Sequence, residues 1–298
     1  TASHLDRAEC CAICKSLKGQ LIEMTHQSQT QFVSGPAGKI AVHTQGSETG
    51  PAVILTHSIL SSSMMWLEQA YLLSSSGWRV IAIDTRGHGQ SECQSVMCTM
   101  DDLVADTLAV MDAMNISKAH YMGLSLGGMS GVGLGIQHAD RLLSMVLCDC
   151  RADMPSPMGD VWNDRITSAI TEGCQSLAVA TTKRWFGVPF IEANEVVGKA
   201  FRQTIASTTA SGFVSCARAI QGLDYLDQVS HIKVPTTLIV GAKDGPLPQA
   251  MQDMQQRITG AKLEVIPDAG HLPNIDQSVL FNAAMMRHFF QNPAWSQA

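Results

Sequence analysis

Short apolar runs alternate with segments of helical spacing along much of the chain. An apolar run of about five residues without polar alternation is typical of a strand that is buried on both faces. Strands and helices in alternation predict parallel strands joined by crossover helices, which cover both faces of the sheet. The predicted strands are residues 52–56, 79–84, 119–124, 142–147, 236–240 and 262–266, and the predicted helices are residues 65–73, 101–114, 126–137, 249–258 and 277–290.

The alternation stops near Asp149 and resumes near Thr236. Between these points, residues 151–228 show helical patterning without a clear strand, which predicts a helical lid (cap) inserted into the sheet domain. The sequence therefore predicts an α/β fold with a mostly parallel central sheet and helices on both faces. Its core consists of residues 20–150 and 229–298, and the inserted lid consists of residues 151–228.

The chain that precedes the first buried strand has a different pattern. Residues 20–33 and 39–44 are predicted to form two further strands, and the segment 34–38, which contains Gly and Pro, is predicted to be the turn between them. Residues 1–19 are mixed in polarity, and we predict that they are an N-terminal extension that forms a short helix.

The segment Gly123-Leu124-Ser125-Leu126-Gly127 has the form G-x-S-x-G and lies between a predicted strand and a predicted helix. In that context the motif forms a nucleophile elbow, a tight turn that lifts the serine hydroxyl clear of the sheet. Side chains two residues before and after the serine would collide with the turn, so glycine is favoured there. The following helix directs its N-terminal amides at the reacting carbonyl. We predict that Ser125 is a nucleophile; the alternative is a Gly-rich turn that only packs closely.

A serine hydroxyl needs a base to accept its proton, and the base needs an acid to orient it. Along the chain, hydrolases of this type carry these residues in the order Ser, acid, His. His271 lies in a loop after the last predicted strand and is the predicted base. Asp244, which follows strand 236–240, is the predicted acid. Asp149, at the end of the strand before the lid, is the competing acid, and Asp268 is predicted to point into its own loop.

Acyl transfer also needs two backbone N–H groups aimed where negative charge develops. One predicted donor is Leu126, which follows the nucleophile, and the other is Ile59, in the loop after the first buried strand. Loss of one such donor typically costs about 10²–10³ in rate. Of the other histidines, His57 lies near this loop, His88 is predicted to be structural, and His288 is predicted to face solvent or to pack on the last helix.

Composition and charge exclude several classes of function. A net charge of −6 without a cluster of Lys and Arg excludes a nucleic-acid surface. The sequence contains no run of about 18 apolar residues, so we predict no membrane span. It contains neither G-x-G-x-x-G nor a phosphate-binding loop, so we predict no nucleotide cofactor. Nine scattered cysteines include Cys11 and Cys14 but no second CxxC pair, so they do not form a zinc site and are typical of reduced thiols in a cytoplasmic protein. We therefore predict no metal and no cofactor.

Over residues 20–290 these motifs resemble the α/β-hydrolase superfamily, and within it the sequence is most similar to the 3-oxoadipate enol-lactonases. The stretches that carry the resemblance are residues 84–91 (DTRGHGQS), 123–129 (GLSLGGM), 134–136 (LGI), 144–148 (SMVLC), 184–186 (RWF), 212–216 (GFVSC) and 219–220 (AI). The chain departs from the family pattern in its oxyanion loop, residues 57–60 (HSIL), where Asn-Ser-Leu-Gly is frequent. It also has Cys148-Asp149 where Cys-Asn is more usual.

The resemblance implies an α/β-hydrolase fold and the ring opening of a small carboxylate-bearing enol-lactone through an acyl-enzyme intermediate, a reaction of aromatic degradation. It also implies a cation for the substrate carboxylate. Arg184 is the predicted ligand, with Trp185 as an apolar wall and Met129 beside them. The alternative places Lys183 and Arg184 on a solvated helix face and Trp185 in the lid core. A broader carboxylesterase, another lactonase such as an acyl-homoserine lactonase, a cofactor-free perhydrolase and a non-catalytic binding protein stay open, as does a homo-oligomer.

Overall fold

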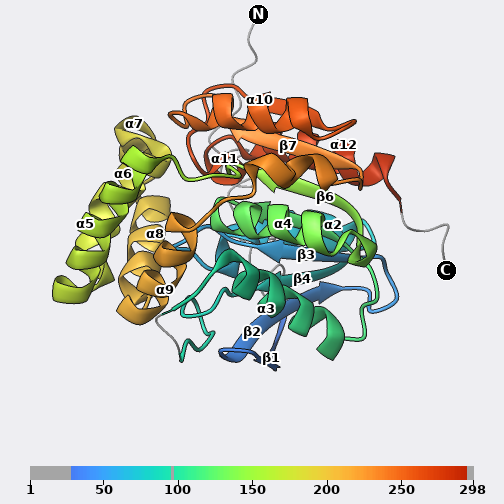
Figure 1. The fold of residues 1–298 in the computed structure, drawn as a ribbon, viewed down its shortest axis with the longest axis horizontal. Helices are drawn as coiled ribbons and strands as arrows, with labels where there is room; N and C mark the ends of the chain where they lie inside the picture. Colours follow the sequence, from blue (N-terminus) through green and yellow to red (C-terminus); the bar gives the residue numbers. More distant parts are fainter. Residues whose placement is uncertain (1–27, 95–96, 294–298) are drawn as a thin grey trace, which may run out of the picture.

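The computed structural model describes residues 28–94 and 97–293, and its centre is an eight-stranded sheet (Figure 1). The strand order is β1-β2-β4-β3-β5-β6-β7-β8. The pairs β1–β2 and β2–β4 are antiparallel, and the other neighbouring pairs are parallel, which confirms the predicted fold class. The strands are β1 (Gln29–Gly35), β2 (Gly38–Gly46), β3 (Ala52–Thr56), β4 (Arg79–Ile83), β5 (Ala119–Leu124), β6 (Leu142–Cys148), β7 (Thr236–Gly241) and β8 (Lys262–Ile266).

All six strands predicted from apolar runs are present, and β3, β5 and β8 have the predicted bounds. The central strands β3, β5 and β7 are buried along their whole length, whereas β8 lies at the sheet edge and is partly exposed. The strand predicted over residues 20–33 begins at Gln29 in the structure, and residues 20–27 lie outside the described residues, as does the helix predicted within residues 1–19.

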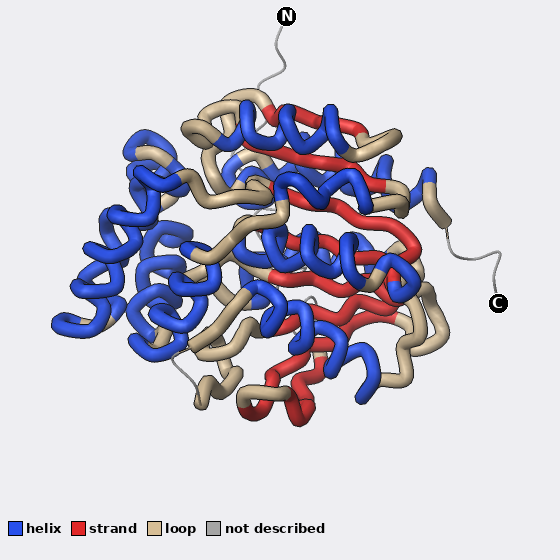
Figure 2. The backbone as a smooth tube through the Cα atoms, in the orientation of Figure 1, coloured by secondary structure: helices blue, strands red, loops and turns tan. Residues whose placement is uncertain are grey.

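Helices cover both faces of the sheet (Figure 2). Helices α3, α4 and α10 lie on one face, and α2 and α12 pack against strands from the other. Among the five predicted helices, α4 has the predicted bounds, and α3 and α10 are shifted by one or two residues. A 3-10 turn, Ser63–Trp66, precedes α2, and the last helical segment starts earlier and is broken at Gln277. The helices are α2 (Leu67–Ser75), α3 (Met100–Ala113), α4 (Leu126–Gln137), α10 (Leu247–Arg257), α11 (Pro273–Asp276) and α12 (Ser278–Gln291).

The chain between β6 and β7 forms a separate group of helices beside the sheet, at the left of Figure 1. Within this segment the described residues contain no strand, only an isolated bridge between Asp153 and Asp224 where the segment leaves and rejoins the sheet domain. The helical patterning predicted there is therefore confirmed. The helices are α5 (Ser156–Glu172), α6 (Ala178–Phe186), α7 (Val188–Ala193), α8 (Glu195–Ser207) and α9 (Ala210–Gln221).

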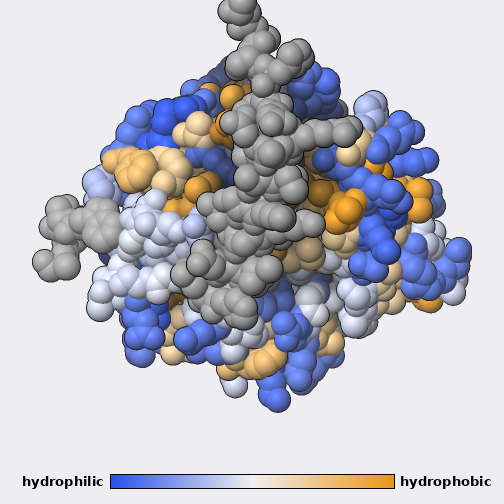
Figure 3. Space-filling view, turned by 180° about the vertical axis from the view of Figure 1, so that it is seen from behind, coloured by the Kyte–Doolittle hydropathy of each residue, from blue (hydrophilic) through white to orange (hydrophobic). Residues whose placement is uncertain are grey.

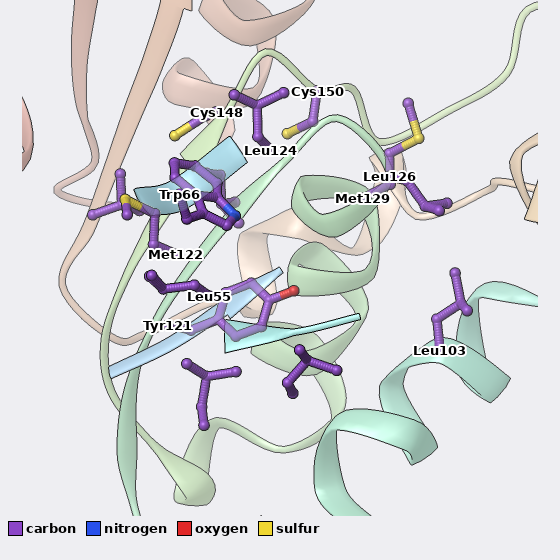
Figure 4. Close-up of a cluster of buried hydrophobic side chains, with 14 of the residues drawn as sticks. Leu55, Trp66, Leu103, Tyr121, Met122, Leu124, Leu126, Met129, Cys148 and Cys150 are labelled. Atoms are coloured by element: carbon purple, nitrogen blue, oxygen red, sulfur yellow. The ribbon is translucent and has the colours of Figure 1, made fainter. Parts of the chain in front are cut away.

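The core between sheet and helices brings α4 very close to β5 (Figure 4). Tyr121 and Met122 of β5 and Leu126 of α4 are fully buried. A Cβ atom on Gly131 would lie 2.4 Å from a ring carbon of Tyr121, so glycine is required for this approach. Because α4 lies this tightly on the sheet, its N-terminus and Ser125 are fixed at the carboxyl end of β5.

The opposite side of the molecule shows a mixed surface (Figure 3). In the part of that face that is not covered by grey, hydrophilic and hydrophobic residues alternate over short distances. None of the helices among the described residues has the length and apolar character needed to cross a membrane.

Candidate active site

Ser125 occupies a sharp turn between β5 and α4. Its backbone has φ 56° and ψ −112°, a conformation that non-glycine residues rarely adopt. Its N–H donates to the backbone oxygen of Cys148 at 2.8 Å, so the neighbouring strand β6 holds the turn in place. The side chain is 5% exposed. This geometry is the strained elbow that the motif predicts.

The two motif glycines are required by close backbone approaches. A Cβ on Gly123 would lie 2.3 Å from the backbone oxygen of Gly127, and a Cβ on Gly127 would lie 2.5 Å from the backbone oxygen of Thr56. Neither neighbour is the end of a flexible side chain, so neither clash could relax without moving the backbone. Local sterics therefore explain why G-x-S-x-G, and not a serine alone, specifies this turn.

His271 and Asp244 form a buried pair. The Nδ1–H of His271 donates to Oδ2 of Asp244 at 2.6 Å, and both side chains are at most 5% exposed. The loop of His271 follows β8 and is held by its own N–H, which donates to the backbone oxygen of Trp185 at 2.8 Å. Burial alone would raise the pKa of Asp244, but the imidazole of His271 and its hydrogen bond lower that pKa below its usual value.

Asp149, the competing acid of the sequence prediction, lies next to this pair but does not take the same hydrogen bond. Its Oδ1 accepts the N–H of Gly241 at 2.9 Å, and its side chain is fully buried. Asp268 was predicted to point into its own loop, but its side chain is exposed and forms an ion pair with Lys243 at 2.7 Å. Of the three candidate acids, Asp244 is the one that hydrogen-bonds to His271.

Two free N–H groups lie where an oxyanion hole is predicted. Leu126 is the first residue of α4, so its N–H has no acceptor within the helix. The N–H of Ile59 likewise has no hydrogen-bond partner among the described residues. Ile59 and Ser125 line one cavity.

His57 connects the loop of Ile59 to the elbow. The N–H of Thr85 donates to Nε2 of His57 at 2.8 Å, which leaves the proton on Nδ1, where it donates to the backbone oxygen of Ser58 at 2.8 Å. The backbone oxygen of His57 accepts the N–H of Gly127 at 3.2 Å. Burial lowers the pKa of His57, so the ring stays neutral and serves as a fixed brace. The sequence placed His57 near this loop but did not reveal this role.

The cavity above Ser125 has a volume of about 360 Å³, within the range of small-molecule sites. Ser125 and His271 both line it, and so do the three predicted substrate-binding residues, Met129, Arg184 and Trp185. Trp185 is 2% exposed and stacks on the ring of His271, with ring centroids 6.4 Å apart. Trp185 is thus both a cavity wall and part of the lid core.

The sequence left open whether Arg184 faces the substrate or lies on a solvated helix face, and the structure shows both. The side chain of Arg184 is 53% exposed and also lines the cavity, and one of its Nη atoms lies 4.0 Å from Oδ1 of Asp244. The neighbouring Lys183 is exposed and does not line the cavity. Arg184 can therefore reach both a ligand in the cavity and the acid of the candidate triad.

Arg165 is a second guanidinium in the cavity, and sequence reasoning missed it. It lies over the ring of Trp162 at 4.7 Å and near that of Phe213 at 5.6 Å, and it donates to Oγ1 of Thr181 at 3.2 Å. Among the described residues no carboxylate pairs with it. Burial, and next the positive charge of Arg184, lower the pKa of Arg165 to about 10, so it remains charged at neutral pH.

The third cavity arginine is already neutralised. Arg151 donates to Oδ1 of Asp153 at 2.8 Å and to the backbone oxygen of the same residue. A ligand anion is therefore better served by the other two guanidinium groups. The position of Arg165 on an amphipathic helix carried no signal of this role, because Phe213 and Thr181, which hold it, come from other helices.

Two further histidines prove to be structural. His88 is buried, and its Nδ1–H donates to the backbone oxygen of Arg86 at 3.0 Å, as the prediction of a structural residue requires. His288 is 3% exposed and hydrogen-bonds to Thr237 and Ser144, so it packs and does not face solvent.

One group of side chains has the composition of a metal site. Ligand atoms of Asp149, Asp244 and His271 lie within 4.8 Å of one another, the one such group found among the described residues. However, the Nδ1 atom of His271 is already engaged by Asp244 at 2.6 Å. The hydrogen bond between His271 and Asp244 accounts for this arrangement, and we assign no metal to it.

Comparison with known proteins identifies the family of this chain. The family model described as alpha/beta hydrolase fold matches residues 51–278. The chain is 35% identical to 3-oxoadipate enol-lactonase 1 of Acinetobacter baylyi over 253 residues, 84% of this chain and 93% of the relative. It is 30% identical to 3-oxoadipate enol-lactonase 2 of the same organism, over 81% of this chain and 90% of the relative.

Solved structures give the same picture. The enol-lactonase of Burkholderia xenovorans LB400 superposes with a TM-score of 0.84 at 32% identity, covering 87% of this chain and all of that one (100%). A thermophilic esterase of Thermogutta terrifontis superposes with a TM-score of 0.82 at 27% identity, covering 89% of this chain and 100% of the esterase.

Proposed function

This chain belongs to the alpha/beta hydrolase family and is related to enol-lactonases and esterases, and on that premise we propose that it is a serine hydrolase that opens a small carboxylate-bearing enol-lactone such as 3-oxoadipate enol-lactone. One observation carries the proposal. Ser125, with its strained backbone, and His271, which is hydrogen-bonded to Asp244, line one small cavity, although the three residues come from distant stretches of chain.

The chemistry assigned to these residues is acyl transfer in two halves. The Oγ atom of Ser125 attacks the lactone carbonyl while Nε2 of His271 takes its proton, and Asp244 stabilises the imidazolium through Nδ1. The N–H groups of Ile59 and Leu126 hold the oxyanion. The ring C–O bond breaks, and the enol leaving group takes the proton from His271 and tautomerises to a ketone. Water, deprotonated by His271, then releases the acid and regenerates the serine.

Two guanidinium groups in the cavity support a substrate that carries a carboxylate. Arg165 and Arg184 line the same cavity as Ser125, and Arg165 has no anion among the described residues. A partly buried cation without a counter-ion is costly, so binding a carboxylate there would recover that cost. The guanidinium fork also suits bidentate contact with a carboxylate.

We assign the role of lid to the helical segment between β6 and β7. This segment supplies Arg165, Arg184 and Trp185, whereas the sheet domain supplies Ser125 and His271. Recognition and chemistry therefore come from different parts of the chain, so substrate preference can change without changing the triad.

A carboxylesterase that acts on neutral esters is the second candidate. It is favoured by the apolar side chains in the cavity wall and by the 4.0 Å contact that turns Arg184 toward Asp244. The apolar lining residues are Ile59, Met129, Met154, Val161, Trp162, Leu177, Ala180, Trp185, Ile220, Pro246 and Leu247.

A pair of matched esters separates the two candidates. We compare kcat/KM for a para-nitrophenyl ester with a terminal carboxylate, such as the glutarate monoester, and for the neutral butyrate ester. Arg165→Gln is expected to lower kcat/KM for the anionic ester roughly 10- to 100-fold, mainly through KM, because a charge-assisted hydrogen bond is lost. Arg218→Gln is the matched control, since Arg218 is exposed on α9 and does not line the cavity. Equal losses for both esters, or none, would contradict carboxylate recognition.

A further inference from the structure

Asp149 is a second carboxyl group beside the acid of the candidate triad. It follows β6 with φ 42°, a region that Asp and Asn tolerate better than most residues. Its Oδ1 accepts the N–H of Gly241 at 2.9 Å, and its own N–H donates to the backbone oxygen of Ile239 at 3.0 Å. These two bonds to β7 fix the carboxyl at the end of the strand that delivers Asp244.

The second oxygen of Asp149 has no such bond. Oδ2 is buried and has no hydrogen-bond partner among the described residues. Carboxylate atoms of Asp149 and Asp244 and a ring nitrogen of His271 lie within 4.8 Å of one another. Two negative charges this close, both out of water, repel each other strongly, and such pairs hold one proton between them. Burial first, and then the charge of Asp244, raise the pKa of Asp149 well above its usual value.

We propose that Asp149 keeps its proton and directs it at Asp244, so that the acid behind His271 is a carboxyl–carboxylate pair. This inference rests on the proposed function, because it assigns a positioning role within that triad. The proton of the pair stays in place during the reaction: Asp149 donates, Asp244 accepts, and the proton that moves is the one passed between Ser125 and His271. Asp149 touches neither substrate nor reacting atoms.

The surrounding charges agree with one negative charge at this position. Burial raises the pKa of Asp276 to about 6, so this third carboxyl is largely ionised only above that pH. Arg184, 4.0 Å from Asp244, is the cation in contact with the pair among the described residues. The thiols of Cys148 and Cys150 stay neutral, because burial raises their pKa values well above the usual range. The groups that bear on Asp149 are therefore Asp244, Asp276, His271, Arg184, Cys148 and Cys150.

Substitutions of Asp149 distinguish a neutral carboxyl from an ionised one. Asp149→Gly removes the carboxyl, yet glycine accepts the positive φ without strain. Asp149→Asn keeps a neutral group that can donate to Asp244 and accept from Gly241. With a para-nitrophenyl ester we expect Asp149→Gly to lower kcat/KM roughly 10- to 100-fold, as for a lost hydrogen bond to a charged group. Asp149→Asn should restore it to within about threefold of the unmodified protein.

The pH profile gives a readout that a purely structural role would not move. The acid limb of kcat/KM reports the ionisation of the essential base in the free enzyme. If Asp149 is neutral, Asp149→Asn leaves this limb in place. If Asp149 is ionised, the substitution removes a negative charge beside the imidazole and shifts the limb down by about one pH unit or more. That downward shift, or a failure of Asp149→Asn to restore activity in protein that melts like the unmodified chain, would overturn the proposal.

A double variant provides an independent measurement. In Asp244→Asn, Asp149 is the carboxyl that remains in the group of ligand atoms within 4.8 Å of one another around His271 among the described residues, and it is then free to ionise and to pair with the imidazole. We expect the single variant to lose less than the roughly 10⁴-fold that such a change costs a triad with one carboxylate. Asp149→Asn combined with Asp244→Asn should lose at least about tenfold more than Asp244→Asn alone. Equal activity of the single and double variants would contradict the pairing.

The failure of this inference can be told apart from the failure of the proposed function. If the unmodified protein turns over the ester and Ser125→Ala abolishes turnover, the triad stands, and the Asp149 variants test the pair alone. If neither the unmodified protein nor Ser125→Ala turns over the ester, the proposed function itself is wrong.

Discussion

Two buried clusters among the described residues contain both a serine and histidine. In the first, Ser125 and His271 line one cavity, and His271 is hydrogen-bonded to Asp244. In the second, Oγ of Ser144 lies 2.7 Å from Nδ1 of His120 and 2.8 Å from Nε2 of His288, deep between β6, β5 and α12. In the second cluster the serine is hydrogen-bonded to both histidines, yet this cluster lacks the other requirements for catalysis.

The difference between the clusters lies in backbone, access and charge. Ser144 sits within an extended strand, whereas Ser125 sits at φ 56° on a turn. Ser144 does not line the cavity of Ser125, and no carboxylate contacts its two histidines among the described residues. Burial lowers the pKa of His120 to about 4 and that of His288 to about 3, so both stay neutral. A serine next to histidine is therefore not a catalytic site unless an elbow, a carboxylate and a cavity accompany it.

The largest expected difference is in turnover. Ser125→Ala should lower kcat for a para-nitrophenyl ester by about 10⁴–10⁶-fold, because no nucleophile remains. Ser144→Ala should leave kcat and KM unchanged within about threefold, since Ser144 is far from the cavity. Steady-state assays of both purified variants, with concentration set by folded protein, make the comparison. A large loss in Ser144→Ala alone would reverse the assignment of the two clusters.

The elbow gives the next largest effect. Gly127→Ala adds a Cβ that would lie 2.5 Å from the backbone oxygen of Thr56. The displaced hydroxyl and N–H donors should cost roughly 100-fold in kcat, as misplacement by about 1 Å does in other enzymes. Gly159→Ala on α5 is the matched control, because nothing lies within 4 Å of its added Cβ. Full activity of Gly127→Ala would show that the tight turn is not needed.

Stability should respond in the opposite order from turnover. Ser144→Ala leaves Nδ1 of His120 and Nε2 of His288 buried without a partner, which should lower the free energy of unfolding by about 1–3 kcal/mol. Ser125→Ala removes a hydroxyl at a strained turn and should change it by less than about 0.5 kcal/mol. Urea unfolding followed by circular dichroism measures both. A stability loss confined to Ser125→Ala would contradict the structural role of Ser144.

Acid sensitivity is the smallest expected effect. His120 and His288 have folded-state pKa values of about 4 and about 3, below the usual 6.5. Above pH 6.5 neither the folded nor the unfolded protein binds a proton at these rings. Below pH 6.5 the unfolded protein binds protons there, whereas the folded protein does not. Each ring then destabilises the fold by up to about 1.4 kcal/mol per pH unit until the folded pKa is reached.

One substitution separates the contribution of His288 to acid sensitivity from the contributions of other groups. His288→Gln keeps hydrogen-bonding groups near Thr237 and Ser144 but does not titrate. Its free energy of unfolding should fall less steeply between pH 6.5 and pH 4 than that of the unmodified protein, by up to about 1.4 kcal/mol per pH unit. Identical slopes would show that His288 does not contribute.

The elbow could be predicted from residues close together in the sequence, whereas the rest of the site depends on contacts between residues far apart in the sequence. The turn at Ser125 follows from Gly123 and Gly127, which act within five residues, and the bounds of β5 and α4 were predicted to the residue. The polar network of His288 could not be predicted, since Ser144 lies 144 positions away in the chain.

The role of Arg165 in the cavity could not be predicted from the sequence either. Its sequence context is an ordinary amphipathic helix, and its value as an anion ligand comes from Phe213 and Arg184, which belong to other helices. Likewise, the ends of β6 and β7 both carry an acid, and only the position of His271 shows that Asp244 takes the hydrogen bond. Sequence patterns located the strand ends, and tertiary packing selected among the side chains there.

The most direct test of the account is labelling of the folded protein with a serine-reactive fluorophosphonate, followed by peptide mass spectrometry. The expected result is one adduct, on the peptide that contains Ser125, with no adduct on Ser144 and none in Ser125→Ala. An adduct on another serine, or no adduct in protein shown to be folded by circular dichroism, would contradict the assignment of Ser125 as an activated nucleophile.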